Sequence, residues 1–476
     1  MSMKGDKSIV LLPIKTFLIL LCSFSILVCP GCKSKDISNP IVMNPEELVV
    51  WEYDPIDQPL NHNKYIYQDW YFIDVFTQGQ RVAFTAYDIQ NGKILWQAPE
   101  EFFKVPVDFA PFFGQKYSSV VFSENLMILP NQKQELVAFD LASFTPKWRL
   151  PSQDQAITLL GTNDTYLFLS TEDHTLLAVD LKTGSIMHKE VFQKHVDFVL
   201  DLDFNQIALV SEDKHHLWIW DTESWESIFH FSQSTDKVVT STLMSNQRKL
   251  YFLTYTFGTS IYALDLNLQK IIWKQSFSEE CYYKFSELKL FLYQDILLVP
   301  FWKLNNEPNV KLLSISDGKQ IHHPKWKELF FSTKIHEKKS NEGEYMIICG
   351  IHESKLILTS PFTFRSKLFC YDLERNELDW KLTFMELIDG PIVINEKYLF
   401  VSDRTGSRSS DPHQGYYLIE ILSGKNLWQT RTERGSFNQF YQYFESPHWN
   451  TLVFPYDSNK ILDLAPIIQS WEARKP

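Results

Sequence analysis

The order of apolar and polar positions predicts strands along most of the chain. Apolar runs such as Leu176–Val179 end at an acidic residue and are followed by turn-forming residues such as Lys182–Ser185. A second and more polar run then closes on a large aromatic ring. Short apolar runs bounded by turn signals are typical of buried strands, and Gly in the turn supplies the positive φ of a tight hairpin. We therefore expect each such phrase to form a β-hairpin.

The hairpin phrase recurs along the chain with one internal spacing. In each clear copy an acidic residue precedes Trp by eight positions: AYDIQNGKILW (Ala86–Trp96), AFDLASFTPKW (Ala138–Trp148), ALDLNLQKIIW (Ala263–Trp273) and CYDLERNELDW (Cys370–Trp380). Five looser copies keep this register: Asp180 with His188, Asp221 with Phe229, Ser314 with His322, Glu420 with Trp428, and Asp463 with Trp471. We call the aromatic or His residue that ends each copy the hook residue. Four copies have Gly four residues after the first position: Gly92, Gly184, Gly318 and Gly424.

The copies lie 40 to 58 residues apart, and another apolar run precedes nearly every hairpin. Units of about 40–50 residues with four strands each predict an all-β fold, a β-propeller of four-stranded blades. Eight blades are preferred, within a range of seven to nine, because closed propellers typically have about four to eight. Val49–Tyr53 is predicted to be an outer strand that completes the blade begun by Phe440–Leu464 and so joins the two ends of the chain.

The repeated phrase resembles the tryptophan-docking motif of the PQQ-like (quinoprotein-type) propellers, which reads Ala-x-Asp, three residues, Gly, three residues, Trp. The resemblance covers roughly residues 60–472. It implies that the Trp packs between adjacent blades while the acidic residue and the turn backbone hold it. The structural docking residues expected on this basis are Asp88, Trp96, Asp140, Trp148, Asp180, Asp265, Trp273, Asp372, Trp380, Trp428 and Trp471. The scaffold serves enzymes and binding proteins alike, so the motif indicates fold more than function.

The N-terminus has the order of charged, apolar and small residues that is typical of a secretory signal. Residues 1–31 are predicted to be a signal peptide whose apolar run is Phe17–Cys29. The Gly-Cys that follows resembles the lipobox of bacterial lipoproteins, which implies lipid attachment at Cys32. Residues 32–47 are then the lipidated Cys and a flexible tether, and residues 48–476 a single propeller domain. Secretion without lipid and an uncleaved anchor are the alternatives.

The charge of the chain makes nucleic acid an unsuitable partner. The formal net charge is −12, and it becomes −14 (43 basic and 57 acidic residues) once residues 1–31 are removed. An acidic surface without a basic stripe repels a phosphate backbone.

Cys349 and Cys370 are placed on the first and third strands of one blade, about two strand spacings (~9.6 Å) apart, which is too far for a disulfide.

The sequence offers little support for catalysis. Propeller dehydrogenases that use pyrroloquinoline quinone normally carry adjacent cysteines and a Ca²⁺ site, whereas this chain has no Cys-Cys dipeptide and no D-x-[DN]-x-[DN]-G run. Adjacent residues of a strand point to opposite faces, so neither His215-His216 nor His322-His323 can chelate one metal ion. The motif acids are expected to cap turns. We therefore predict no enzyme activity, no catalytic residue, no metal and no cofactor.

The connection between the second and third strands of a blade lengthens from the fifth repeat onward. It is short at Glu172–His174 and Glu212–His215, whereas the later connections are Thr254–Thr259, Trp302–Asn309, Pro361–Ser366 and Asp403–Gln414. Insertions that recur on one face of a repeat fold are typical of a binding surface, although surface loops also tolerate neutral insertion. The candidate binding face comprises aromatic and Arg residues of these loops: Tyr255, Phe257, Trp302, Phe362, Phe364, Arg365, Arg404 and Arg408.

Among PQQ-like propellers, lipid-anchored members without cofactor resemble this chain most, in particular the propeller lipoprotein of the outer-membrane protein assembly machinery. The resemblance implies a protein-binding scaffold in the envelope of a Gram-negative-type bacterium. The chain would be tied to the membrane through Cys32, facing the periplasm rather than the cell surface, with an outer-membrane barrel as one potential partner. The first alternative is a surface-exposed propeller lipoprotein that binds a ligand or glycan. The second alternative is a quinone-dependent dehydrogenase.

Overall fold

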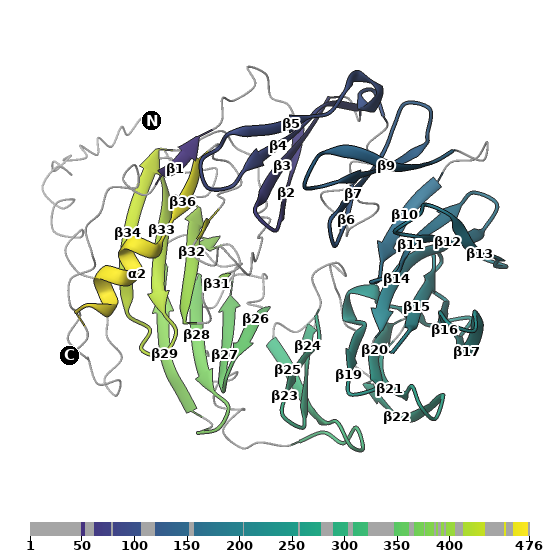
Figure 1. The fold of residues 1–476 in the computed structure, drawn as a ribbon. Helices are drawn as coiled ribbons and strands as arrows, with labels where there is room; N and C mark the ends of the chain where they lie inside the picture. The colour runs from purple at the N-terminus through teal and green to yellow at the C-terminus, as the bar shows by residue number, and fades with distance from the viewer. Residues whose placement is uncertain are drawn as a thin grey trace, which may run out of the picture. The chain divides into compact units, whose positions relative to one another are not determined.

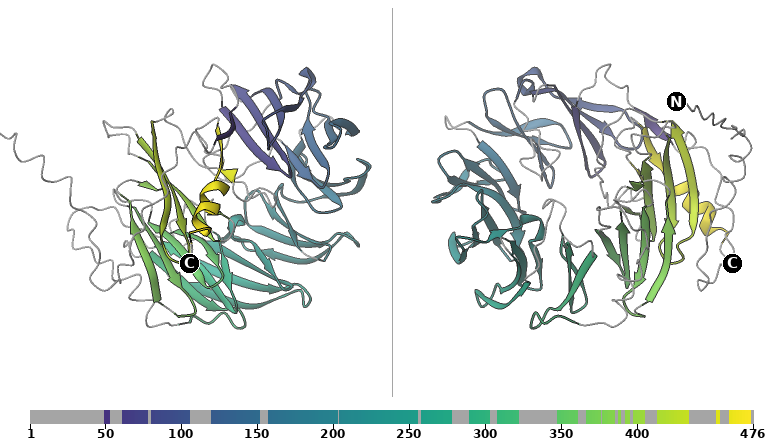
Figure 2. Two further views of the ribbon diagram at one scale, coloured as in Figure 1. Left: turned by 60° about the vertical axis from the view of Figure 1, so that its left-hand side comes forward. Right: turned by 180° about the vertical axis from the view of Figure 1, so that it is seen from behind.

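The computed structural model describes the strands of the repeated hairpins and the segments next to them. The described residues are 49–52, 61–77, 80–105, 120–151, 157–202, 204–255, 258–277, 289–302, 308–321, 347–360, 366–375, 377–384, 387–388, 392–394, 397–404, 413–433, 452–453 and 460–474. They form nine antiparallel sheets that follow one another along the chain (Figure 1). Figure 2 shows the same succession of sheets from two further directions. The fold is therefore an all-β propeller, as predicted, and each sheet is called a blade below.

The first four blades are four-stranded sheets in chain order. Blade 1 comprises β2 (Asn61–Tyr67), β3 (Trp70–Thr77), β4 (Gln80–Asp88) and β5 (Ile94–Gln97), followed by the short 3-10 helix η2 (Glu100–Phe102). Blade 2 comprises β6 (Val121–Ser123), β7 (Leu126–Pro130), β8 (Leu136–Asp140) and β9 (Thr145–Leu150). Blade 3 comprises β10 (Ile157–Thr162), β11 (Tyr166–Thr171), β12 (Thr175–Asp180) and β13 (Ile186–Val191). Blade 4 comprises β14 (Val196–Leu202), β15 (Gln206–Ser211), β16 (His216–Asp221) and β17 (Glu226–Ser232).

The next four blades keep this order with local variations. Blade 5 comprises β18 (Lys237–Val238), the 3-10 helix η3 (Thr240–Thr242), β19 (Met244–Asn246), β20 (Lys249–Tyr255), β21 (Thr259–Asp265) and β22 (Lys270–Phe277). Blade 6 comprises β23 (Phe291–Tyr293), β24 (Ile296–Trp302) and β25 (Pro308–Ser314). Blade 7 comprises β26 (Ile347–His352), β27 (Lys355–Ser360), β28 (Lys367–Asp372) and β29 (Glu377–Thr383). Blade 8 comprises β30 (Leu387–Ile388), β31 (Ile392–Ile394), β32 (Tyr398–Arg404), β33 (His413–Glu420) and β34 (Asn426–Glu433).

Blade 9 joins the two ends of the propeller domain. Its central strand β36 (Lys460–Asp463) pairs on one side with β35 (Leu452–Val453) and on the other with β1 (Val49–Glu52). The predicted pairing of the Val49–Tyr53 segment with the C-terminal strands is confirmed. The described residues thus form nine sheets, one more than the preferred count of eight and within the predicted range.

The ninth copy of the hairpin phrase departs from the predicted second strand. After Asp463 the chain forms the helix α2 (Ala465–Glu472), which contains Trp471. Pro466 stands in the first helical turn, where its fixed φ and missing N–H are compatible with a helix but would interrupt a strand ladder. The Asp463 carboxylate accepts the Ala465 N–H at 2.8 Å, which satisfies one of the free backbone donors at the start of this helix.

The hydrophobic core lies between blades rather than within one sheet. Seven clusters of buried side chains each combine residues of two successive blades, from blades 1 and 2 to blades 7 and 8, and an eighth joins blade 8 to α2. In blade 3 the third strand β12 is buried at five of its six positions, whereas the fourth strand β13 alternates between half-buried and exposed residues. A strand buried on both faces requires a neighbouring sheet on each side, which explains the continuous apolar runs.

The two cysteines of blade 7 lie where the repeat predicts them. Cys349 is on β26 and Cys370 on β28, separated by β27 in the sheet. Cys370 is a free and buried thiol. Burial raises the pKa of this thiol to about 12, so it remains protonated and packs as a small apolar side chain.

The predicted signal peptide, Cys32 and the tether lie outside the described residues. Within the described residues, no helix combines the length and the apolar character needed to cross a bilayer.

Removal of β1 tests the closure of the propeller. A chain that begins at residue 54 lacks β1 and exposes the edge of β36, whereas a chain that begins at residue 48 retains the pairing. Since unpaired strand edges promote association, we expect the shorter chain to unfold at a lower temperature and to aggregate more readily. Calorimetry and light scattering measure both quantities, and equal behaviour of the two chains would contradict the role assigned to β1.

Candidate functional site

The motif acids hold the turns of their own hairpins. The Oδ1 atom of Asp180 accepts the N–H groups of Lys182 and Thr183 at 3.1 and 2.8 Å. At Asp88, Asp221, Asp265 and Asp372, the Oδ1 atom likewise accepts the backbone N–H groups of the residues two and three positions later. Asp140 accepts the N–H and the hydroxyl of Ser143, both at 3.0 Å, and these bonds lower its pKa. An Asp that bonds to its own turn is the expected partner of such a hairpin.

The residue four positions after the acid shapes the outer face of each turn. Its N–H donates to the carbonyl of the acidic position, for example from Gly184 to Asp180 at 2.8 Å. This closes a one-turn loop and places the residue at positive φ. The values are 68° at Gly92, 51° at Phe144, 73° at Gly184, 57° at Trp225, 52° at Gln269, 68° at Gly318 and 66° at Gly424. We call this position the docking position, because at five of the described blade interfaces the hook residue of the preceding blade lies against it.

Three Trp hooks meet a Gly at the docking position of the next blade. The Trp148 indole N–H donates to the Leu181 carbonyl at 2.8 Å, and its ring lies so close to Gly184 that an added Cβ would stand 2.7 Å from it. The same arrangement joins Trp273 to Ile315 O (3.0 Å) over Gly318, and Trp380 to Ile421 O (2.6 Å) over Gly424. The three rings are 7–8% exposed. The carbonyl acceptors directly follow the first position of each motif.

Two interfaces use a bulky residue at the docking position instead of Gly. Trp96 of blade 1 stacks on Phe144 of blade 2, with ring centroids 5.6 Å apart and planes 11° from parallel. His188 of blade 3 stacks on Trp225 of blade 4 at 4.5 Å and 3°. The large ring has therefore moved from the hook to the turn between blades 3 and 4, which explains why a His occupies this hook position.

The last two hook residues lie around α2. Trp428 is fully buried among Leu464, Ile467 and Ile468 of the C-terminal segment. Trp471 packs back against blade 8, where its indole N–H lies 3.4 Å from a Glu420 carboxylate oxygen and Lys425 Nζ lies 4.4 Å from the ring centroid. Trp471 therefore contacts the blade that precedes it in the chain, in contrast to the Trp hooks of blades 2, 5 and 7.

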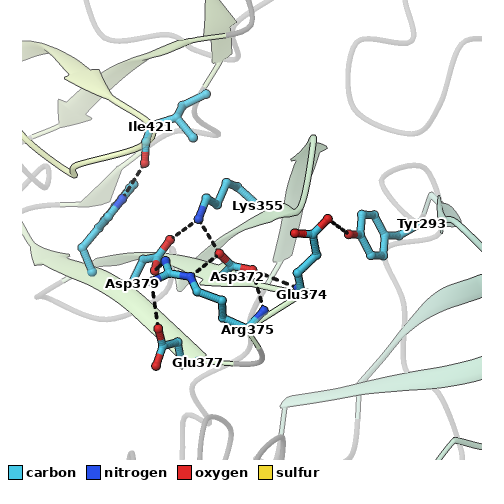
Figure 3. A network of polar contacts seen from close by, with 9 residues as sticks. Tyr293, Lys355, Asp372, Glu374, Arg375, Glu377, Asp379 and Ile421 are labelled. Carbon is cyan, nitrogen blue, oxygen red and sulfur yellow. Dashed lines mark hydrogen bonds and ion pairs between the residues drawn. The ribbon is translucent and has the colours of Figure 1, made fainter.

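A network of ion pairs surrounds the docking motif of blade 7 (Figure 3). Lys355 Nζ lies 2.6 Å from carboxylate oxygens of both Asp372 and Asp379. Arg375 pairs with the same two carboxylates and with Glu377. The side chains of Lys355, Asp372 and Asp379 are 5–9% exposed. Three carboxylates and two cations thus meet at this site, where Lys355, Asp372 and Asp379 are buried while Arg375 and Glu377 are about half exposed.

The network also connects blade 7 to both of its neighbours. The Tyr293 hydroxyl of blade 6 donates to Glu374 in the turn of blade 7 at 3.3 Å. On the other side, the Trp380 indole N–H reaches the Ile421 carbonyl of blade 8. Asp372 lies between these contacts, since it caps the turn and binds both Lys355 and Arg375.

The charges of the network shift the pKa values of its members. Burial alone would raise the pKa of Asp372, but the bonds from Lys355 and Arg375 outweigh burial and hold it well below its usual range. Burial likewise opposes the charged form of Lys355, yet its bonds to Asp372 and Asp379 raise the Lys355 pKa above its ordinary value. Both groups are therefore ionised at neutral pH, where each stabilises the other.

The candidate binding face is only partly within the described residues. Tyr255 ends β20, is half-buried against the core between blades 5 and 6, and has a pKa raised by burial. Trp302 ends β24 and Arg404 ends β32, at the connections that precede β25 and β33. Phe257, Phe362, Phe364, Arg365 and Arg408 lie outside the described residues. The strand order confirms that the lengthened loops each precede the third strand of a blade.

The sequence did not reveal the ionic network, because its members come together only through the pairing register of neighbouring strands. Lys355 lies directly opposite Asp372 across β27 and β28, and their separation in sequence is 17 residues. A Lys at the start of a second strand, facing the acidic end of the third, is the signal that would have identified this pair. For metal ions, the part of the chain that the structure describes contains no group of three or more His, Cys, Asp or Glu arranged as ligands.

Comparison with known proteins agrees with this architecture. Residues 47–190 match the family model described as "Outer membrane protein assembly factor BamB". The predicted resemblance to the PQQ-like propellers is confirmed over that segment, which contains β1 to β12 and all but the last residue of β13. No curated protein matches the chain in sequence.

Several solved structures match this chain at low sequence identity. BamB from Moraxella catarrhalis is 11% identical over 71% of this chain and 92% of that chain, with a TM-score of 0.43. The computationally designed Ika8 protein is 10% identical over 76% and 93%, with a TM-score of 0.43. The dihydro-heme d1 dehydrogenase NirN is 11% identical over 70% and 68%, with a TM-score of 0.44. These neighbours include an enzyme as well as proteins whose names indicate no enzyme activity.

Gly184→Ala tests the contact between hook and docking position. The added methyl would stand 2.7 Å from the Trp148 ring on a backbone with φ of 73°, so both a clash and backbone strain result. We expect a loss of about 1–3 kcal/mol in the free energy of unfolding, measured by urea denaturation. Gln269→Ala is the matched control, because Gln269 is the residue four positions after Asp265 in blade 5 and already carries a side chain at a φ of 52°. Equal losses in the two variants would contradict the assigned contact.

Lys355→Met tests the ionic network. At pH 7 we expect the free energy of unfolding to fall by about 3 kcal/mol. This is the lower end of the range for breaking a buried ion pair, because Arg375 remains beside both carboxylates. The depressed Asp372 pKa stabilises the fold above the ordinary carboxyl pKa of about 3.9, and this stabilisation is lost as pH falls below that value. The variant lacks much of this stabilisation, so the difference in the free energy of unfolding between wild type and variant should be smaller at pH 3 than at pH 7.

Urea midpoints at the two pH values measure this difference. Lys319→Met is the control, because Lys319 and Asp317 form an exposed pair, which contributes little to stability. A Lys355→Met variant that is as stable as Lys319→Met at pH 7 would show that the network does not stabilise blade 7.

Proposed function

We propose that this chain is a non-catalytic, lipid-anchored β-propeller that acts as a protein-binding scaffold in the cell envelope and takes part in outer-membrane protein assembly. The observation that supports this proposal most directly is the match of residues 47–190 to the family of outer-membrane assembly factors. In the proposed arrangement Cys32 carries the lipid, and the propeller of residues 48–476 stands in the periplasm at the end of the tether.

The contacts of the motif residues support a structural rather than a catalytic role. The motif acids Asp88, Asp140, Asp180, Asp265 and Asp372 each accept backbone N–H groups of their own turns. The Trp hooks are buried against the next blade and use their indole N–H groups there. Side chains that satisfy one another in this way are placed to hold blades together, and we propose this as the role of the docking residues.

The proposed partner is a protein of the envelope, with an outer-membrane barrel as the specific candidate. We assign its binding to the lengthened connections after β20, β24, β27 and β32, since these carry the aromatic and Arg residues that anchor interfaces. In an antiparallel blade the connection between second and third strands lies at the opposite end from the hairpin turn that receives a hook. Partner binding and blade docking therefore use different ends of each blade.

Co-purification after gentle detergent extraction tests the function. The wild type is expected to incorporate a labelled fatty acid, which Cys32→Ser abolishes, and to retain an outer-membrane barrel. Deletion of Pro361–Ser366 should reduce the retained barrel at least about tenfold, as expected when the anchors of an interface are removed. Leu268→Ser is the control, because Leu268 is exposed in a hairpin turn at the opposite end of blade 5.

A wild-type preparation that retains no barrel would contradict the assembly role. Accessibility of the propeller to protease added to intact cells, together with retention of a glycan, would instead favour the surface-exposed alternative. A barrel that is retained equally by the loop deletion would leave the scaffold in place but remove the proposed binding face.

A further inference from the structure

Two histidines meet on the outer half of blade 4. His216 begins β16, His230 lies on β17, and the register places His230 directly opposite Trp218. His216 and Trp218 are two residues apart on one strand and so share a face of the sheet. His216 Nδ1 lies 3.1 Å from His230 Nε2. The three rings are nearly parallel, within 16° of one another, with centroids 5.3–5.4 Å apart.

The distance between the two nitrogens suits a shared metal ion. Ring nitrogens bind Zn²⁺ at about 2.0–2.1 Å, so two nitrogens on one ion stand about 2.9–3.4 Å apart in octahedral or tetrahedral geometry. The observed separation of 3.1 Å falls within this interval. In the absence of an ion one imidazole donates to the other. For both nitrogens to bind one metal ion, the donor ring moves this proton to its other ring nitrogen, which changes its tautomer and leaves it neutral. Imidazole is a ligand of Zn²⁺, Ni²⁺ and Cu²⁺ alike.

The surroundings hold the pair in place and leave it accessible. Trp218 is 9% exposed and packs against Phe192, with ring centroids 4.9 Å apart, so the shared face of β16 is well ordered. His230 is exposed and His216 is half-buried, which leaves room for water to complete the coordination.

Histidine binds a metal ion as the neutral imidazole, through a ring nitrogen that carries no proton. His215, next to His216 in sequence, instead points its Nδ1 to the carbonyl oxygens of Gln233 and Asp236 at 3.1 Å.

We propose that His216 and His230 form a two-histidine site for a divalent transition-metal ion, with water molecules as the remaining ligands. The ion would join strands β16 and β17 at the exposed edge of blade 4. Two protein ligands define a site for an exchangeable ion rather than a permanently bound structural metal, since closed structural sites use four.

Calorimetric titration of the full-length protein in detergent, without a polyhistidine tag, tests the site with Zn²⁺ as the probe. We expect one binding event in the wild type that is at least tenfold weaker, or lost, in His216→Gln and in His230→Gln, with no further loss of this event in the double variant. His195→Gln is the control: this ring also contacts a second histidine, His174, but at a centroid distance of 6.0 Å. It should bind as the wild type does.

A second measurement identifies the ligands without substitution. Paramagnetic Ni²⁺ added at low stoichiometry should broaden the imidazole NMR signals of His216 and His230 before those of other histidines. Thermal unfolding in metal-free buffer verifies that each variant is folded. Failure of the wild type to bind Zn²⁺, or binding that persists unchanged in the folded double variant, would overturn the proposal.

Discussion

The seating of an aromatic ring from one blade on the hairpin turn of the next is the interaction on which the remaining structure depends. In blade 3, for example, the third strand is buried on both faces and its side chains join the clusters shared with blades 2 and 4, so the blade cannot bury its core alone. At five interfaces the hook packs into the gap between its own blade and the docking position of the next blade. At three interfaces an indole N–H also binds a backbone carbonyl of the next blade. Packing thus fills the gap, and the hydrogen bond fixes the relative position of the two sheets.

The size of the docking residue determines which ring can serve as hook. Where Gly stands at positive φ, the indole lies flat against the turn and its N–H reaches the carbonyl. Where Phe144 or Trp225 occupies the same position, the hook stacks on the side chain instead. This second arrangement, in which the turn supplies part of the aromatic surface, occurs in a clear copy of the motif at Phe144 and in a looser copy at Trp225.

Much of the fold follows from the sequence because hairpins are local. The acidic residue, the turn and the hook lie within nine consecutive residues, and their spacing predicts both the strands and the repeat. The pairing of β1 with β36 was also predictable, since a propeller must close. By contrast, the Lys355 network and the His216–His230 pair depend on cross-strand register, which a single sequence specifies poorly. The helix at Trp471 was missed because the repeat outweighed the local signal of Pro466.

The proposed function places partner binding and blade docking at opposite ends of the blades, so the docking contacts serve as the rigid support of the binding loops. The central claim is that the hook rings are held by the next blade, and hydrogen exchange of the indole N–H groups measures this directly. In NMR of the ¹⁵N-labelled protein, we expect the indole protons of Trp148, Trp273 and Trp380 to exchange with solvent only through global unfolding of the protein. Exchange of these three protons at the rate of a solvent-exposed indole would contradict this claim.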